Sequence, residues 1–150
     1  MAEAAGQSGL AKDFLLEVVT PEKQLVSERV VALRAPGIAG EFGVLPSHER
    51  LITALGTGLL RYRLRDDDDE WIELPVSAGL VEVLPDRVII LAQTAEMPRA
   101  IDVQRAEAAR ARARERLAHP EEDTDIERAL NALERATVRL QATGGKTSDS

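Results

Sequence analysis

The residue pattern of this chain changes abruptly at about residue 98, and no other feature constrains the fold as strongly. Before that point, short runs of Val, Leu and Ile are broken by turn residues about every ten positions, which is typical of an all-β sandwich or barrel. After it, residues 102–118 consist mainly of Ala, Arg and Glu without Gly or Pro, and these are strong helix formers. The predicted fold is mainly β plus α. It comprises a flexible leader (1–12), an N-terminal antiparallel β-sandwich (13–98), a C-terminal antiparallel two-helix hairpin (99–143) and a disordered tail (144–150).

Within the β half, the stretch Leu-Arg-Tyr-Arg-Leu-Arg alternates strictly between apolar and basic side chains, as a half-buried strand does. We expect Leu60, Tyr62 and Leu64 on the core face. The three arginines would lie on the other face, which is either solvated or meets an acidic partner. The four aspartates at 66–69 repel one another and favour a solvated hairpin tip. The continuous apolar run at 88–92 predicts a strand covered on both faces.

Each of the two helices has recognisable ends. Asp102 is a natural N-cap for the first helix, and His119-Pro120 ends it. For the second, Thr124 with Glu127 three residues later matches a capping box, so we predict Thr124 as the N-cap. Gly144-Gly145 gives the stop signal.

Each predicted helix carries one narrow seam of apolar or small residues. In the second helix the seam recurs at spacings of four and three and consists of Ile126, Leu130, Leu133, Thr137 and Leu140. In the first helix it consists of Val103, Ala106, Ala109, Ala113 and Leu117. These seams bury little apolar area against the entropy of ordering two helices. The hairpin should therefore be marginal alone and need the sandwich, another protein or a ligand to fix it.

Residues 40–49 combine two glycines, a proline and three ionisable side chains between two apolar runs. Gly40 and Gly43 permit backbone conformations that other residues avoid, and Pro46 fixes its own φ angle. The stretch is predicted to be a shaped loop. Such a loop either carries function or is an ordinary solvated turn.

Charge and composition argue against several function classes. A net charge of −7 and a pI near 4.9 disfavour nucleic acid as a partner. No apolar run approaches the roughly 20 residues that span a bilayer, so direct membrane insertion is not expected. The absence of cysteine fits a reducing compartment. An enzyme is disfavoured because the two histidines, His48 and His119, are far apart in sequence and neither stands in a metal-ligand or nucleophile pattern.

A series of short motifs runs through the chain in a fixed order: Thr20-Pro21-Glu22, Pro36-Gly37, Gly40-Glu41-Phe42-Gly43-Val44-Leu45-Pro46 with His48, Thr53-Ala54-Leu55 with Gly58, Ala78-Gly79-Leu80-Val81-Glu82-Val83, and Thr94-Ala95-Glu96. In these motifs, over residues 14–117, the chain resembles the epsilon subunit of the F-type (bacterial) ATP synthase. That family has a β-sandwich followed by a helical hairpin. Two positions depart from it: Ser47 stands where the family usually has Gly, and Arg50 where it often has an apolar residue.

The resemblance implies a non-catalytic central-stalk (rotor) subunit of a proton-translocating ATP synthase, which requires no cofactor. Such a subunit links the gamma subunit to the c ring and lies peripherally at the cytoplasmic face of the bacterial inner membrane. By resemblance, Glu41 and His48 are the candidate ring contacts. The hairpin would extend toward the catalytic alpha/beta head and inhibit ATP hydrolysis. Its first helix would then present a basic surface of Arg105, Arg110, Arg112, Arg114 and Arg116. A free-standing β-sandwich adaptor with a coiled-coil tail is the alternative.

The segment Ile101-Asp102-Val103-Gln104-Arg105-Ala106 looks like the motif with which some bacterial members bind ATP. The resemblance implies a regulatory ATP site formed by Glu96, Asp102, Arg105, Arg112, Arg135 and Arg139. Read from the residues alone, Asp102 is explained as an N-cap, and arginines on helix faces are usually solvated or paired with glutamate. No Gly-rich phosphate loop is present, so any bound ATP would be a regulator and not a substrate.

Overall fold

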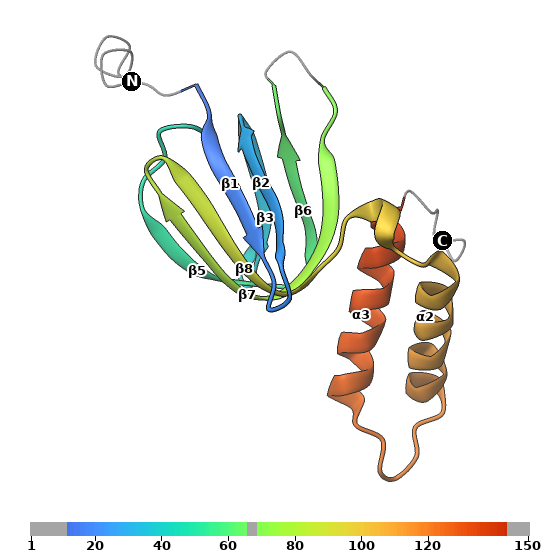
Figure 1. Cartoon of the computed structure of the whole chain (residues 1–150). Coiled ribbons are helices and arrows are strands. Elements are labelled where there is room, and N and C mark those ends of the chain that lie inside the picture. The colour runs from blue at the N-terminus through green and yellow to red at the C-terminus, as the bar shows by residue number, and fades with distance from the viewer. Residues whose placement is uncertain (1–11, 66–68, 144–150) are drawn as a thin grey trace.

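The computed structural model describes residues 12–65 and 69–143. The predicted tail, nearly all of the predicted leader and most of the aspartate run lie outside the described residues. An eight-stranded sheet folds over into two layers, and two α-helices follow it (Figure 1). The elements are β1 (Phe14–Val19), β2 (Gln24–Val30), β3 (Ala32–Gly37), β4 (Gly40–Val44), β5 (Leu51–Leu55), β6 (Gly58–Arg63), β7 (Ile72–Leu84), β8 (Arg87–Ala95), a 3-10 turn η1 (Pro98–Ala100), α2 (Val103–Ala118) and α3 (Ile126–Ala142).

The sheet is organised around β7, the longest strand at 13 residues. Its first part pairs with β6 and its second part with β5, and both of those strands also pair with β3. The described strand pairs are antiparallel except β1 with β8, which is parallel. The predicted β-sandwich followed by a helical hairpin is therefore confirmed, with one parallel pair that the sequence did not predict.

The two parts of β7 meet at Ala78 and Gly79, where the backbone adopts an unusual conformation. Both residues have positive φ, 52° and 149°. A Cβ atom on Gly79 would lie 1.9 Å from the carbonyl oxygen of Leu91 on β8. Glycine is therefore required here for the close approach of the two strands as well as for the φ angle.

The core between the layers is filled mainly by aliphatic side chains. Leu60 and Tyr62 point into it, as the alternation predicts, whereas Leu64 lies beyond the end of β6 and is 37% exposed. The prediction for Leu64 is therefore wrong, because the strand pairing stops one residue earlier. Burial raises the pKa of the Tyr62 hydroxyl, and the negative charge of Glu28 raises it further.

The prediction that residues 88–92 form a strand covered on both faces is wrong. Along β8, Val88, Ile90 and Ala92 are buried, but Leu91 between them is 48% exposed. The run looks continuous because apolar residues also occupy positions on the outer face of the sheet.

The N-cap of α2 agrees with the prediction, whereas the N-cap of α3 differs from it. Asp102 caps α2, and its Oδ1 accepts a hydrogen bond from the Arg105 backbone N–H at 3.1 Å. The cap of α3 is Asp125, whose Oδ1 accepts from Arg128 N–H at 3.0 Å, so the predicted capping box is wrong. Thr124 instead accepts at Oγ1 from the Glu121 backbone N–H, which closes the connection between the helices.

The buried positions of the two helices agree only in part with the predicted seams. In α3 the buried positions are Ala129, Ala136, Val138 and Leu140, whereas Ile126 and Leu130 are 44% and 52% exposed. In α2 the buried positions are Ala106, Arg110 and Ala113, and Val103 is 40% exposed. The predicted seam positions Ala106, Ala113 and Leu140 are thus confirmed as buried, whereas the prediction is wrong for Val103, Ile126 and Leu130. In this folded arrangement Arg110 therefore does not belong to a surface basic patch.

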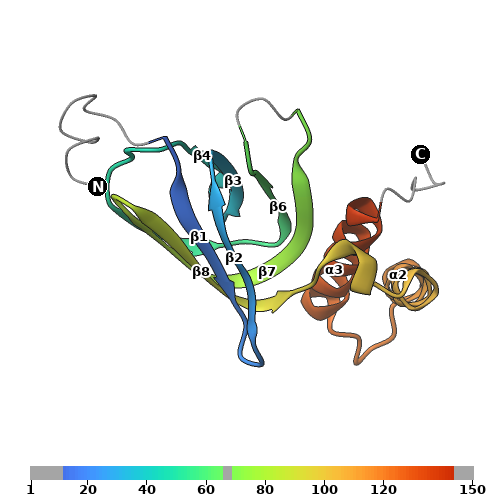
Figure 2. The same ribbon diagram turned by 45° about the horizontal axis from the view of Figure 1, so that its top comes forward.

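The hairpin lies beside one end of the sandwich, with α3 next to β7 (Figures 1 and 2). α3 packs against β7 and β6, and α2 packs on α3 as the outer helix. The order of the layers in space is therefore sandwich, α3 and α2, although α2 precedes α3 in the sequence.

Candidate functional site

The end of β8, η1 and the two helices surround a cavity of about 380 Å³, here called the junction cavity. Five of the six residues predicted to form a regulatory nucleotide site line it. Its lining consists of Glu96, Ala100, Ile101, Asp102, Arg105, Ala106, Ala109, Arg112 and Arg139. Residues up to 43 positions apart in sequence therefore meet only when the hairpin is folded against the sandwich.

One ion pair connects the two domains at this cavity. Arg139 Nε on α3 donates to Glu96 Oε1, just past β8, at 2.5 Å. Both side chains are about one-third exposed, 35% and 33%. The contact is partly solvated, so it fixes the position of α3 without contributing strongly to stability.

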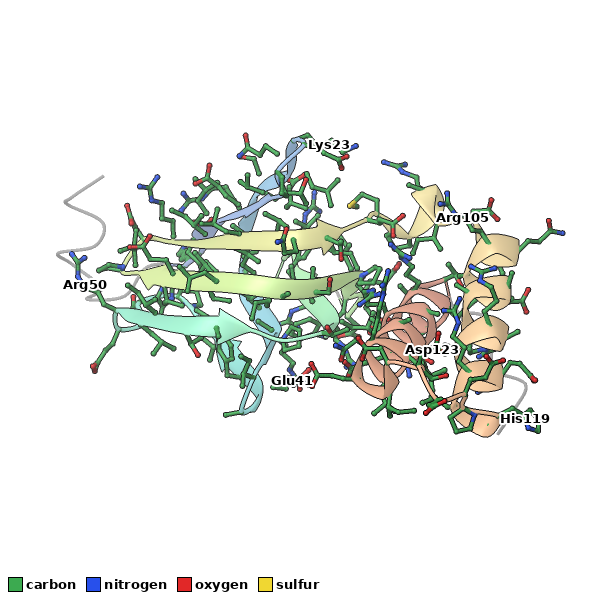
Figure 3. All side chains as sticks on the ribbon, turned by 90° about the horizontal axis from the view of Figure 1, so that it is seen from below. Lys23, Glu41, Arg50, Arg105, His119 and Asp123 are labelled. Carbon is green, nitrogen blue, oxygen red and sulfur yellow. The ribbon has the colours of Figure 1, made fainter. Side chains whose placement is uncertain are left out.

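The other charged groups of the junction cavity come mainly from α2. Asp102 already uses Oδ1 as the helix cap, which leaves its second oxygen available. Arg105 and Arg112 line the same cavity, and Figure 3 shows Arg105 on the part of α2 nearest the sandwich. Three guanidinium groups thus face two carboxylates, and forked N–H donors of this kind suit phosphate oxygens.

The structure does not bring Arg135 into the junction cavity. It lines a neighbouring space with Pro75, Val76 and Arg139, whose volume of about 10 Å³ is close to the minimum for one water molecule. Arg135 lies one helical turn before Arg139, so its distance from a ligand depends on where the Glu96 pair holds Arg139.

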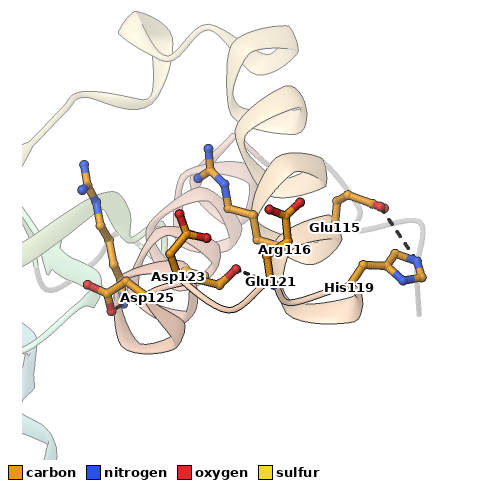
Figure 4. Close-up of a pocket in the computed structure, with 9 residues that line it drawn as sticks. Glu115, Arg116, His119, Glu121, Asp123 and Asp125 are labelled. Atoms are coloured by element: carbon orange, nitrogen blue, oxygen red, sulfur yellow. Dashed lines mark hydrogen bonds and ion pairs between the residues drawn. The ribbon is translucent and has the colours of Figure 1, made fainter.

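A larger cavity of about 580 Å³ lies at the connection between α2 and α3 (Figure 4). Its wall mixes acidic groups such as Glu115, Glu121 and Asp123 with Arg116 and His119. His119 Nε2 lies 3.8 Å from Glu115 Oε1. No group of described His, Asp and Glu residues there or elsewhere is arranged to hold a metal ion. This cavity was not predicted, although Glu121, Glu122 and Asp123 are adjacent in the sequence.

Glu41 and His48 do not share one loop, and this corrects the prediction for residues 40–49. The first half of the stretch is β4, in which Glu41 pairs with Pro36, and Gly40 has a φ of 132°. Glu41 is exposed on the side of the sandwich toward the helices, whereas Arg50 marks the opposite end (Figure 3).

His48 is held by backbone carbonyls. Its Nδ1 lies 2.7 Å from Leu45 O, and its Nε2 contacts Leu84 O at the end of β7. Its ring also meets the core residue Phe14 edge-on, with centroids 5.0 Å apart. This geometry makes His48 a residue that fixes the chain after β4 to the sandwich.

A row of apolar residues crosses the outer face of four strands, with Leu80 and Leu91 exposed at its centre and Ala54 and Val19 half-buried at its ends. Ala54, Leu80, Leu91 and Val19 are successive cross-strand partners on β5, β7, β8 and β1. A groove of about 450 Å³ lies along the row beside Thr20-Pro21. Leu91 was predicted to be covered as part of the apolar run 88–92, and no burial was predicted for Leu80.

In the described part of the chain, neither helix is both long and apolar enough to cross a bilayer.

Two family models match two contiguous parts of the chain. Residues 13–98 match the model for the β-sandwich domain of the ATP synthase delta/epsilon chain, and residues 99–144 match the model for its long α-helix domain. The ATP synthase epsilon chain of Syntrophobacter fumaroxidans is 46% identical over 132 residues, covering 88% of this chain and 96% of that one. That of Desulforamulus reducens is 42% identical, covering 89% and 98%.

Solved structures give the same result for the fold. A chain of the Euglena gracilis mitochondrial ATP synthase, from a structure of OSCP, F1 and c-ring, has a TM-score of 0.73 at 25% identity, covering 89% of this chain and 82% of that one. A chain of the Tetrahymena thermophila mitochondrial enzyme has a TM-score of 0.56 at 14% identity, covering 89% and 97%, and supports the fold alone. Two family models spanning residues 13–144 and relatives above 40% identity over nearly their whole length lead to one conclusion: the chain belongs to the ATP synthase delta/epsilon chain family.

Proposed function

We propose that this chain is the rotor subunit that links the gamma subunit to the c ring of a proton-translocating ATP synthase, at the cytoplasmic face of a bacterial inner membrane. The bacterial relatives named ATP synthase epsilon chain support this role, since they match over nearly their full length. The Euglena structure supports it as well, because that assembly comprises F1 and the c-ring. The chain would be peripheral and held through protein contacts.

The apolar row, in which Leu80 and Leu91 are exposed, offers the surface for gamma. Exposed apolar patches on a sheet are typical of protein interfaces, and this row is continuous in register from β5 to β1. Replacing Leu91 by Lys should reduce co-purification of the chain with gamma. Ile126→Lys is the matched control, because Ile126 is exposed to a similar degree, 44% against 48%, but lies on α3. Equal retention of both variants would contradict the assignment.

For the ring contacts, the geometry gives Glu41 and His48 different tasks. The exposed carboxylate of Glu41 can meet polar groups of the ring directly. His48 would act by positioning, because both ring nitrogens already contact carbonyl oxygens. Substitution of either Glu41 or His48 should impair coupling in the assembled enzyme and leave ATP hydrolysis by a detached catalytic head unchanged.

The regulatory part of the proposal concerns the hairpin and ATP. The observation that carries it is the junction cavity, whose charged groups come from the sandwich, α2 and α3 together. A triphosphate there would relieve repulsion among Arg105, Arg112 and Arg139, and it would bind the folded hairpin only. ATP would therefore favour the folded hairpin by mass action. Low ATP would release the hairpin, which would extend toward the catalytic alpha/beta head and inhibit hydrolysis.

A distance measurement tests this regulation directly. One label is placed on the sandwich and one near Leu140, and the separation is measured with and without ATP. We expect ATP to narrow the distance distribution in the native chain and to have no effect in Arg105→Ala. Arg116→Ala is the control, since Arg116 lines the other cavity. A response to ATP that survives in Arg105→Ala would refute the nucleotide site.

A second test concerns inhibition itself. Removal of residues 102–150 from the assembled enzyme should raise ATP hydrolysis, because no helix could then reach the catalytic head. Unchanged hydrolysis would exclude the inhibitory role. The alternative, a free-standing adaptor, would be indicated if the chain purified without any ATP synthase subunit.

A further inference from the structure

The outer face of β3, β6 and β7 carries a concentration of positive charge in an acidic chain. Arg34 on β3 is the direct cross-strand partner of Arg61 on β6, which in turn faces Glu73 on β7. Arg63 follows on the same face of β6. Like charges directly opposite one another destabilise a sheet, so this arrangement costs stability in a protein of net charge −7.

A single tryptophan organises these arginines. The guanidinium carbons of Arg34 and Arg63 lie 5.1 and 5.5 Å from the ring centroid of Trp71. Cation–π contacts of this kind fix the plane of each guanidinium while leaving its N–H donors at the edge. Preformed forks of N–H donors bind carboxylates in a bidentate way.

One of the arginines is open to a ligand. Arg61 Nε lies 3.1 Å from Glu73 Oε2, so this charge is matched within the sheet. Arg34 is exposed, and no described carboxylate forms an ion pair with it. Its partner on the other side is Gly43 of β4, which has no side chain to cover it. A peptide can therefore approach along this side of Arg34.

We propose that the face formed by Arg34, Arg61, Arg63 and Trp71 binds an acidic segment of a neighbouring protein. Carboxylates of that segment would accept paired hydrogen bonds from Arg34, and its aliphatic carbons would lie against the indole. Charge complementarity identifies the occupant, because the face is cationic and aromatic whereas the chain as a whole is acidic. The inference is independent of the nucleotide site and of the apolar row.

Trp71 is the only tryptophan, so its fluorescence reports on this face alone. The full chain is titrated with a short poly-glutamate peptide at low ionic strength, where exposed charges are least screened. We expect a saturable change in emission. Arg34→Gln should weaken binding about tenfold, the loss expected for one charged hydrogen-bonded pair. Arg87→Gln, which alters an arginine on β8 near Glu17, should leave the affinity unchanged. Circular dichroism verifies that each variant is folded.

Several outcomes would overturn the proposal. An equal response to sulfate at matched charge concentration would reduce the face to a general anion site. Tighter binding of a short single-stranded oligonucleotide would assign it to another class of partner. A gain of more than about tenfold when the aspartates at 66–69 become asparagine would assign it to the chain's own acidic run. Equal losses in Arg34→Gln and Arg87→Gln would show that only net charge matters.

Discussion

The side chain of Arg110 is buried on the α2 face that also carries Ala106 and Ala113, with 8% of the residue exposed. Its Nη1 atom has no hydrogen-bond partner among the described residues. Burial of a cation without full pairing costs free energy, and this cost falls only on the folded hairpin. Arg110 therefore weakens the closed state that the alanine seam forms.

Replacing Arg110 by Leu should stabilise the folded hairpin by about 1–3 kcal/mol, because the buried charge is removed at similar volume. Hydrogen exchange of the α2 amides measures the effect, and slower exchange is expected. Arg116→Leu is the control, since Arg116 is exposed on the same helix. Faster exchange in Arg110→Leu would mean that the guanidinium contributes net stability.

Among the described glycines, Gly79 is the one at which an added methyl group is least tolerated. Its φ of 149° is unfavourable for any L side chain, and the added Cβ would lie 1.9 Å from Leu91 O. We expect Gly79→Ala to destabilise the sandwich by about 3 kcal/mol or more in denaturant unfolding. Gly43→Ala is the matched control, because its nearest atom would be Leu33 O at 3.7 Å, an ordinary contact. Similar unfolding midpoints for both variants would contradict this account.

Tyr62 predicts how stability depends on alkaline pH. Its pKa is raised above 10.0 by burial and by Glu28, so the folded state holds the hydroxyl proton more tightly than the unfolded chain. The resulting stability is complete below the unfolded pKa and is lost as pH rises through the folded pKa. The denaturant concentration at the unfolding midpoint should thus decrease as the pH is raised above about 10. Tyr62→Phe should remove this part of the pH dependence, and an unchanged profile would exclude the tyrosine as its source.

At the scale of the elements, the existence of the strands and helices was predictable because periodicity and composition determine them locally. The predictions that were wrong concern features set by tertiary contacts. Asp125 displaced Thr124 as the cap because the Thr124 hydroxyl bonds to Glu121 N–H across the connection. Leu91 could not be told from a core residue, since both faces of β8 carry apolar side chains. In the helices, the burial of Ala106, Ala113 and Leu140 was predicted from spacing, whereas the burial of Arg110 and the exposure of Ile126 depend on packing that spacing does not determine.

The candidate site shows the same limit. Neither its cavity nor the Glu96–Arg139 contact across 43 positions could be read from spacing, although a family resemblance selected the residues. No local rule specifies which side of α3 meets the sandwich. Tertiary packing decides it.

The ion pair between Glu96 and Arg139 gives a prediction for the attachment of α3. A double-mutant cycle with Glu96→Gln and Arg139→Gln should yield a coupling of about 0.2–1 kcal/mol, because both groups are one-third exposed. Hydrogen exchange of the α3 amides provides the free energies. A coupling near zero would show that apolar packing alone positions the helix.

At the scale of the whole molecule, the layers are attached in series: α3 contacts the strands, and α2 contacts α3. The proposed detachment of the hairpin would therefore follow an order. α2 can peel away while α3 stays docked, but α3 cannot depart without first losing α2 or carrying it along. The layered contacts would thus give the proposed opening a half-open form between the closed form and the fully open one. In that half-open form Arg110 would reach water while Glu96 remained paired with Arg139, so the two events could be observed separately.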